Sequence, residues 1–415
     1  MATTTKEQGV WDLDEVYNKI NVGGIWVYNE QRQAFSWGEQ DFGELGVNTS
    51  GSRYSSPKQV GTDGDWSAFG NRGPGANKTS ALWIKSDGTA WMAGINAYGV
   101  LGLNQPGPSS SPTRYSSPVQ IGTDTTWSTA QGKATGVAGG SKIAIKTDGS
   151  LWQWGRQSYG VIVNSPDPNY GHRSSPVQVP GTTWENVSCS TGPGDASTIV
   201  TKSDGSIWVW GRNVSGELGQ NAPTNSHKSS PVQVPSPGPG TTTWQTEEGK
   251  FCGGDSNRYA INTDNELWCW GENERGALGQ NQGGPSAHYS SPVQIPGAWT
   301  WITGGGPGGG AMGIKTDGTA WSWGFNNYGQ TGLNTGTAIS SPTQLPGTWD
   351  RLLMGPWASY GFQGTDLYAW GPNSNGILGQ NGGTNYSSPV QIPGAWADVT
   401  NAAEAVWATK IAGAS

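Results

Sequence analysis

Short apolar runs alternate with polar turns along this chain, and the same arrangement returns seven times at intervals of roughly fifty to sixty residues. Residues 145–155 form an apolar run, a turn at Asp148 and Gly149, and two aromatic residues, Trp152 and Trp154. Asp-Gly suits a tight hairpin turn because it tolerates positive φ. A spacing of two places both rings on one face of a strand. Copies two to six therefore predict a β-hairpin, while the first and last copies have other residues, 29–32 and 364–366, at the turn.

Further markers recur: a Trp-Gly pair in every copy but the second, and in every copy an Asn in the loop that follows, a Ser-Ser-Pro run, and a Trp that closes the unit. The Trp-Gly position holds Trp37, Ala93, Trp154, Trp210, Trp270, Trp323 and Trp370. The loop Asn is Asn48, Asn104, Asn164, Asn221, Asn281, Asn334 or Asn381. The closing residue is Trp66, Trp127, Trp184, Trp244, Trp299, Trp349 or Trp396. Residues that recur in every unit are expected to be scaffold residues.

The fixed Pro of each copy predicts an edge strand or the start of a strand, because proline has no N–H for a central ladder. Strand-rich units without capping helices favour a closed ring, a β-propeller. The tail at 406–411 matches residues 198–202 in register, as the start of an eighth unit would. We expect this tail to complete or overlap the first blade.

This repeat resembles that of the regulator of chromosome condensation family, whose fold is a seven-bladed β-propeller. The resemblance covers about residues 23–415 and implies an all-β, single seven-bladed propeller of four-stranded blades, preceded by a short N-terminal arm at 1–22. The loop Asn and the Ser-Ser-Pro-Val-Gln-Ile-Pro-Gly run look more like the simplified repeats of bacterial and bacteriophage proteins. A shared fold does not imply a shared activity.

Composition narrows the function. The chain has 24 Trp, 67 Gly and 26 Pro among 415 residues, and only 13% of its residues are charged. Burial is therefore expected from a few large rings. The net charge is −7 and the basic residues are scattered, which argues against nucleic-acid binding.

The first residues contain no apolar signal core, and no run is long enough for a transmembrane helix, so we expect no signal peptide and no membrane insertion. Synthesis in a host cytoplasm and a final location in a virion are expected. Three cysteines, Cys189, Cys252 and Cys269, are expected to be free thiols in strands.

The segment before the repeats has apolar residues at helical spacing. One interpretation is a short helix on the propeller rim. The other is an arm that docks into a groove of a partner. The docking residues would be Trp11, Leu13, Val16, Tyr17 and Ile20.

Sites for chemistry are not apparent. His172, His227 and His288 each precede Ser-Ser-Pro, but equivalent loops of neighbouring blades are too far apart to share a metal ion. The repeated Asp residues are interpreted as turn residues. No catalytic set, metal site or cofactor site is therefore predicted.

Tyrosines stand immediately before Ser-Ser-Pro in four copies: Tyr54, Tyr115, Tyr289 and Tyr386. If these loops share a rim, they form a receptor-facing surface for a host protein or glycan. The alternative is that they pack on the blade edge.

These observations favour a non-enzymatic bacteriophage virion protein, such as a tail fibre, an appendage or a head-surface decoration. Its arm would bind other virion proteins and its propeller would serve adhesion or protein binding. The alternatives are a propeller that acts as a small-GTPase exchange factor, and a secreted binder that resembles inhibitory proteins of this fold.

Overall fold

The computed structural model divides the chain into residues 1–31 and residues 32–415, and it describes only the second unit. The described residues are 32–411, apart from 70–79, 108–111, 138–139, 164, 166, 168–170, 190–196, 223–224, 238–242, 255, 285–286, 307–308 and 403.

The described unit consists of antiparallel strands and two short 3₁₀ turns, Ala97–Gly99 and Glu274–Gly276. The strands of the first half of the chain are β1 (Arg32–Gln40), β2 (Ser52–Gln59), β3 (Trp66–Phe69), β4 (Ser80–Lys85), β5 (Ala90–Ile95), β6 (Arg114–Gln120), β7 (Ala134–Val137), β8 (Ser141–Ile145), β9 (Leu151–Gly155), β10 (Arg173–Val179), β11 (Trp184–Cys189), β12 (Ser197–Lys202), β13 (Ile207–Gly211) and β14 (Lys228–Gln233). Those of the second half are β15 (Phe251–Gly253), β16 (Asn257–Ile261), β17 (Glu266–Gly271), β18 (Tyr289–Gly304), β19 (Gly310–Lys315), β20 (Thr319–Gly324), β21 (Ile339–Thr348), β22 (Arg351–Met354), β23 (Ser359–Gln363), β24 (Asp366–Gly371), β25 (Tyr386–Ala402) and β26 (Ala405–Ile411).

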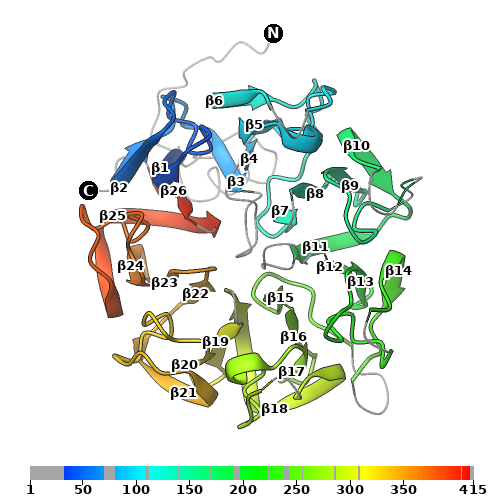
Figure 1. Ribbon diagram of the computed structural model, residues 1–415, viewed down its shortest axis with the longest axis vertical. Helices are drawn as coiled ribbons and strands as arrows, with labels where there is room; N and C mark the ends of the chain where they lie inside the picture. Colours follow the sequence, from blue (N-terminus) through cyan, green and yellow to red (C-terminus); the bar gives the residue numbers. More distant parts are fainter. Residues whose placement is uncertain are drawn as a thin grey trace, which may run out of the picture. The chain divides into compact units, whose positions relative to one another are not determined.

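These strands form three four-stranded sheets and two seven-stranded sheets. Each seven-stranded sheet contains one long strand, β18 or β25, whose first part pairs with the strand before it and whose last part pairs with the strand after it. The long strand thus joins two four-stranded groups. Counted this way, the described strands form seven four-stranded sheets, the blades of a propeller (Figure 1).

We number the blades in chain order. Blade 1 combines both ends of the described chain: the last part of β25, then β26, β1 and β2. Blades 2, 3 and 4 are β3–β6, β7–β10 and β11–β14. Blade 5 is β15–β17 with the first part of β18, blade 6 is the rest of β18 with β19–β21, and blade 7 is β22–β24 with the first part of β25. The first strands of neighbouring blades touch, as β3 does β7 and β7 does β11.

The closing contact is continuous. β26 pairs with β1 from Arg32 opposite Ile411 to Gly38 opposite Ala405. The residues that the sequence placed in the tail therefore form the second strand of blade 1. The fixed Pro of every repeat lies in the fourth strand, at the edge of its blade, where its missing N–H breaks no central ladder.

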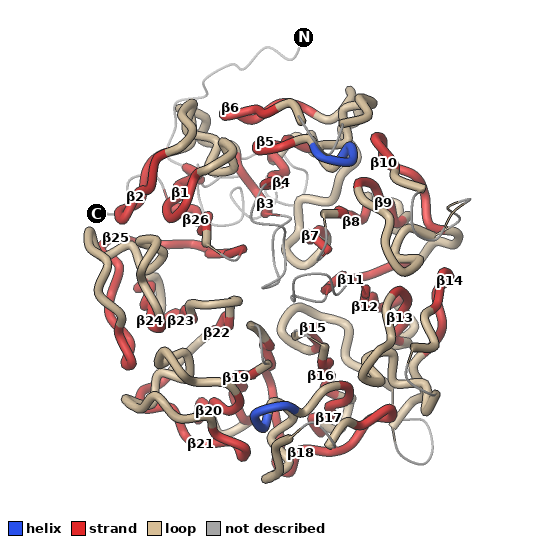
Figure 2. The backbone as a smooth tube through the Cα atoms, viewed as in Figure 1, coloured by secondary structure: helices blue, strands red, loops and turns tan. Residues whose placement is uncertain are grey.

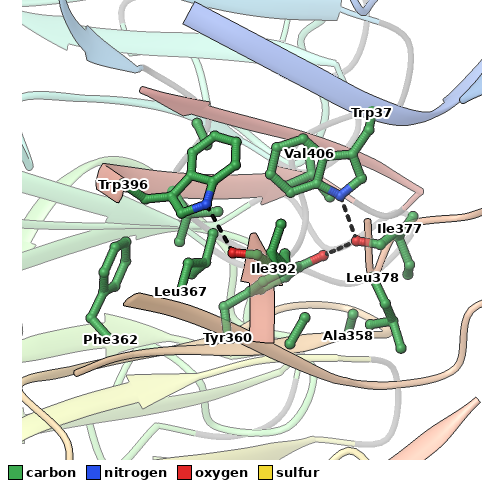
Figure 3. Close-up of a cluster of buried hydrophobic side chains, with 13 residues drawn as sticks. Trp37, Ala358, Tyr360, Phe362, Leu367, Ile377, Leu378, Ile392, Trp396 and Val406 are labelled. Carbon is green, nitrogen blue, oxygen red and sulfur yellow. Dashed lines mark hydrogen bonds between the residues drawn. The ribbon is translucent and has the colours of Figure 1, made fainter. Parts of the chain in front are cut away.

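The Trp-Gly residues hold neighbouring blades together. Trp154, Trp210, Trp270 and Trp323 are all fully buried, as their recurrence predicts. Each donates its indole N–H to a backbone carbonyl of the preceding blade; Trp154, for example, donates to Val100 at 2.9 Å. Figure 3 shows the equivalent contact at the closure, where Trp37 donates to the Ile377 carbonyl at 2.8 Å. The recurring rings are thus hydrogen-bonded joints as well as apolar filling.

The recurring Asn forms a second joint. Asn48 has a φ of 60°, and its backbone N–H donates to the Ser116 carbonyl of the next blade at 2.7 Å. The hydroxyl of Ser117 donates to its side-chain oxygen at 3.2 Å. The same positive φ and the same backbone bond occur at Asn104, Asn221, Asn281, Asn334 and Asn381, while Asn164 lies outside the described residues. Asn tolerates this left-handed conformation better than most side chains.

Blade 2 has no Trp at the Trp-Gly position, so this position donates no indole N–H to blade 1. Ala93 occupies that position and is fully buried. The carbonyl of Glu44, which corresponds to the acceptor of the other joints, receives the indole N–H of Trp407 from β26 at 3.2 Å. Trp407 and Trp83 are both fully buried in the cluster that contains Ala93. The Glu44 carbonyl thus keeps a donor, but this hydrogen bond lies within blade 1 and does not link blade 1 to blade 2.

Candidate binding face

The propeller has two faces of different composition. Because each blade is antiparallel, the links between its third and fourth strands emerge on the side opposite the Asp-Gly turns between its second and third strands. We call these the long-loop face and the turn face. The long loops comprise 41–51, 96–113, 156–172, 212–227, 272–288, 325–338 and 372–385; their described residues are drawn in tan in Figure 2, apart from the two 3₁₀ turns in blue.

On the turn face the Asp residues serve the turns. The Asp148 carboxylate accepts the backbone N–H of Ser150 at 2.9 Å and its hydroxyl at 2.6 Å, and Trp152 donates its indole N–H to that hydroxyl. The hydrogen bond from the Ser150 side chain holds the pKa of Asp148 below its usual value. The same relay occurs from Asp87, Asp204 and Asp317. The interpretation of these residues as turn residues thus accounts for their contacts.

The lysines of the turn face are held between aromatic rings. The Lys146 ammonium lies 5.0 Å from the ring centroid of Trp127 and 4.0 Å from that of Trp152. A cation above a ring face is attracted by the ring quadrupole. Four further lysines sit between two rings in the same way: Lys85, Lys202, Lys315 and Lys410. These charges therefore contribute to the blades themselves.

The long-loop face carries aromatic residues that the sequence analysis did not single out. Phe42, Tyr98, Tyr159 and Tyr328 each lie four residues after the Gly of the Trp-Gly position and directly before another Gly. We call them the loop aromatics. Tyr159 and Tyr328, with 38% and 50% of their surface exposed, are the exposed large hydrophobic residues of the described part.

The next blade covers three of the loop aromatics with arginine. The guanidinium carbon of Arg114 lies 4.9 Å from the Phe42 centroid, and that of Arg156 lies 5.0 Å from the Tyr98 centroid. Arg212 lies farther out, 6.0 Å from Tyr159. The face therefore combines aromatic rings with arginine side chains.

The three histidines complete this arrangement. The imidazole of His172 lies 4.7 Å from the Tyr98 ring, and that of His227 lies 4.9 Å from the Tyr159 ring. The Nδ1 atoms of His172, His227 and His288 each accept a backbone N–H of their own blade, from Gln157, Asn213 and Asn273. Partial burial lowers the pKa of His172 and His227. Among the described residues, no group of three or more His, Cys, Asp or Glu side chains is placed to hold a metal ion.

The rim tyrosines predicted from the sequence lie on the fourth strands, opposite the Gly of the Trp-Gly position. Tyr54 pairs with Gly38, Tyr115 with Gly94, Tyr289 with Gly271 and Tyr386 with Gly371. All four are half-buried and pack against the core clusters. The structure thus places them on the blade edge, and receptor binding at this rim stays a prediction.

The docking residues Trp11, Leu13, Val16, Tyr17 and Ile20 lie outside the described residues. Cys252 and Cys269 are free and buried, and burial raises the pKa of both thiols. No helix in the described part of the chain is both long and apolar enough to cross a membrane.

One feature of the sequence marks the loop aromatics, which is their fixed spacing from the Trp-Gly position. The other blades, however, place Ser215, Arg275 and Asn375 there. A search for repeated residues therefore passes over them. An alignment of the copies that looks for variable positions between fixed ones would have found them.

Comparison with known families identifies the repeat. The model of the regulator of chromosome condensation (RCC1) repeat matches residues 204–242 and 317–351. The prediction of repeats of this kind is confirmed. The bacteriophage or bacterial form of the repeat stays a prediction.

Two human relatives match parts of the chain. The E3 ubiquitin-protein ligase HERC2 of Homo sapiens is 26% identical over 217 residues, which are 49% of this chain and 4% of HERC2. The RCC1-like G exchanging factor-like protein of Homo sapiens is 24% identical over 256 residues, 61% of this chain and 52% of that protein. The chain thus spans about half or less of the length of these relatives.

Solved structures establish the fold. Human WBSCR16 superimposes with a TM-score of 0.73 at 17% identity, over 91% of this chain and 98% of that one. Prp20p of Saccharomyces cerevisiae, which has been studied for binding to Gsp1p and histones, gives a TM-score of 0.72 at 16% identity and covers 92% of each chain. The predicted all-β propeller fold is confirmed by these likenesses.

Proposed function

Because this chain is a propeller that carries RCC1 repeats, we propose that it is a non-enzymatic protein-binding module whose partner docks on the long-loop face. The observation that carries this proposal is the row of loop aromatics and arginines on that face. Tyrosine and arginine dominate the energetics of protein interfaces, whereas lysine is depleted there. The turn-face lysines already lie between rings of their own blades.

Nucleic acid is a poor partner for this surface. The net charge of −7 and the scattered basic residues provide little phosphate neutralisation. A chemical reaction is also unsupported, because the groups with shifted pKa serve structural roles. The Asp carboxylates cap turns, and Cys252 and Cys269 are buried in the core.

Site-specific photo-crosslinking tests the proposal. A photoreactive phenylalanine analogue at Tyr159 reports on the long-loop face, and the same analogue at Thr147, an exposed turn residue, reports on the turn face. We expect a discrete crosslinked protein from position 159 in cells that make this chain, and none from position 147. Crosslinks from position 147 alone, or from neither position, would refute docking on the long-loop face.

The N-terminal segment is proposed to attach the propeller to a larger assembly through Trp11, Leu13, Val16, Tyr17 and Ile20. The support is their spacing, which suits a helix bound in a groove. Removal of residues 1–22 should leave a folded propeller that no longer assembles. Normal assembly of the truncated protein would place the attachment on the blades.

Exchange activity on a small GTPase is a second candidate, favoured by the match to the RCC1-like G exchanging factor-like protein. An exchange factor accelerates the release of fluorescent GDP from the GTPase when present in substoichiometric amount. Binding without acceleration would leave the chain as a binding module only.

The more specific proposal of a virion protein rests on sequence character alone: the simplified repeats, the separate arm and the uncharged polar composition. The location is testable by immunogold labelling of purified particles. Labelled particles support it, and labelling confined to the host cytoplasm contradicts it.

A further inference from the structure

On the long-loop face, blade 7 differs from blades 3 and 4. In blades 3 and 4 an Arg follows the Trp-Gly pair and a His precedes the fourth strand, and both cover the aromatic residue of the blade before. In blade 7 the residue after Gly371 is Pro372, and Asn385 takes the position of the His. Its side-chain oxygen accepts the Asn373 N–H at 2.7 Å, as His172 accepts the Gln157 N–H. Blade 7 therefore has smaller side chains at the two positions that blades 3 and 4 use for covering.

The consequence is an open aromatic corner. Tyr328, the loop aromatic of blade 6, is 50% exposed. Its ring lies 6.4 Å from that of Trp357 at an interplanar angle of 72°, and 6.2 Å from that of Phe325. The rings of Tyr328 and Trp357 both line one pocket, which we call the slot, and their planes meet at 72° instead of forming one flat platform.

Trp357 is itself a departure from the repeat. It lies in the link between β22 and β23, where the corresponding link of blade 6 is Gly305–Gly309 in sequence and has no aromatic residue. Trp83 and Trp407, which are also outside the repeated positions, are fully buried, whereas Trp357 remains partly exposed. Trp357 packs partly against the core cluster that contains Tyr360 and Ile377, and its remaining surface lies beside the uncovered Tyr328.

The slot is a pocket of about 280 Å³ lined by Tyr328, Trp357, Pro372, Asn375, Asn385 and Glu404, among others. This volume is close to the lower end of the roughly 300–1,000 Å³ usual for ligand pockets. Glu404 is the one charged lining residue. The long loops at 325–338 and 372–385 contain no Asp, Glu, Lys or Arg. The surroundings therefore suit a neutral or weakly basic ligand.

We propose that this pocket binds a proline-rich segment of the partner protein in the polyproline II conformation. The inference rests on the protein-binding function proposed above and specifies its partner. Proline-rich segments dock into aromatic-lined grooves, because their backbone is already ordered and loses little entropy on binding. Their unpaired carbonyls accept hydrogen bonds, and Tyr328, Trp357, Asn375 and Asn385 all carry groups that donate them.

Fluorescence anisotropy tests this with a labelled peptide of about ten prolines flanked by lysine, against a glycine-serine peptide of the same length and flanks. We expect saturable binding of the proline peptide alone. Tyr328→Ala and Trp357→Ala should each weaken it by about tenfold or more, as loss of an aromatic anchor does. Ser215→Ala, at the same repeat position on blade 4, is the control and should leave the affinity unchanged.

A second variant keeps both rings and closes the slot. Pro372→Arg combined with Asn385→His recreates the covering pair that blade 3 places over Tyr98. We expect this variant to lose the peptide while its melting temperature stays near that of the parent. Retained binding in this variant, or in Trp357→Ala, would overturn the proposal.

The remaining outcomes are also decisive. Equal binding of the glycine-serine peptide, or no saturable binding, overturns the proposal. A third outcome also overturns it: the proline peptide does not bind, whereas a neutral oligosaccharide such as maltohexaose binds and loses its binding in Trp357→Ala. In each of these cases a crosslink from position 159 would still support a protein partner elsewhere on the long-loop face, so failure of the pocket and failure of the proposed function are distinguishable.

Discussion

Trp407 fills space next to Ala93, where the other blades have a Trp, and this packing predicts a measurable effect of substitution on stability. Trp407 is fully buried and donates to the Glu44 carbonyl. Trp407→Ala removes the ring from the core, which should cost about 3–5 kcal/mol of unfolding free energy. It also leaves the Glu44 carbonyl without this donor, for which about 1–3 kcal/mol is typical, although the two effects overlap.

Ala93→Trp alone should also destabilise the protein. Position 93 is fully buried in the same cluster, so the added ring has no free space, and overpacking of this kind typically costs about 1–3 kcal/mol. In the double variant the ring at 93 enters the space that Trp407 vacates. It also restores the donor that the other blades use. We therefore expect the double variant to be more stable than Trp407→Ala, with a coupling of about 2 kcal/mol or more.

Urea unfolding followed by far-ultraviolet circular dichroism measures the four free energies without relying on tryptophan fluorescence. Ala93→Trp combined with Trp154→Ala is the control, because these positions belong to different clusters and should be closer to additive. If the free-energy changes of Trp407→Ala and Ala93→Trp simply add, the two residues do not share one site and the reasoning is refuted.

Three other perturbations test the joints and turns. Burial raises the pKa of Glu44 from 4.5 to about 7, so the folded state holds a proton that the unfolded chain releases. Stability should fall by about 3 kcal/mol as pH rises through that window, and Glu44→Gln should flatten the dependence of the urea midpoint on pH. Asn48→Gly should leave the unfolding free energy nearly unchanged, because glycine adopts a φ of 60° readily. Asn48→Ala should lower it by about 1–2 kcal/mol, because alanine does not. Equal shifts of the thermal unfolding midpoint in the two variants would contradict this. Lys202→Ala should lower the unfolding free energy by about 1–2 kcal/mol, and Lys202→Met by less, because methionine keeps an apolar stem packed between Trp184 and Trp208. Equal melting temperatures of the parent and both variants would show that the position of Lys202 between the two rings does not stabilise the fold.

Much of the fold was predictable because the same turn and core residues recur in successive repeats. One Asp-Gly pair is a weak signal for a hairpin, but its return before four of the seven aromatic pairs, with Asp264 and Asn265 before a fifth, excludes coincidence. The same holds for Trp154, whose recurrence indicated a core position and whose indole proved to be a joint between blades. What recurrence did not reveal was the partner of each joint, because the carbonyl that accepts the indole lies in the preceding unit.

The candidate site was less predictable for a related reason. Tyr115 caught attention because it stands in a repeated context, and the structure places it half-buried at a blade edge. Tyr328 stands where other copies have Ser215 or Asn375, so no repeated pattern marks it. Its exposure depends on Pro372 and Asn385, which belong to the next blade. Such neighbours across a blade boundary are visible only once the ring is assembled.

Departures from the repeat are therefore informative only when their surroundings are known. At Ala93 the lost ring is replaced from β26, and the same carbonyl regains a donor, so this departure is compensated inside the core. Between blades 6 and 7 the Arg and His that blades 3 and 4 carry are absent, and Trp357, which packs partly on the core, lies next to the exposed ring of Tyr328. Exposed aromatic surface gains nothing for folding, because the ring is already in water in the unfolded chain. Packing inside the fold therefore explains the departure at Ala93, whereas a binding partner would explain the exposed rings between blades 6 and 7.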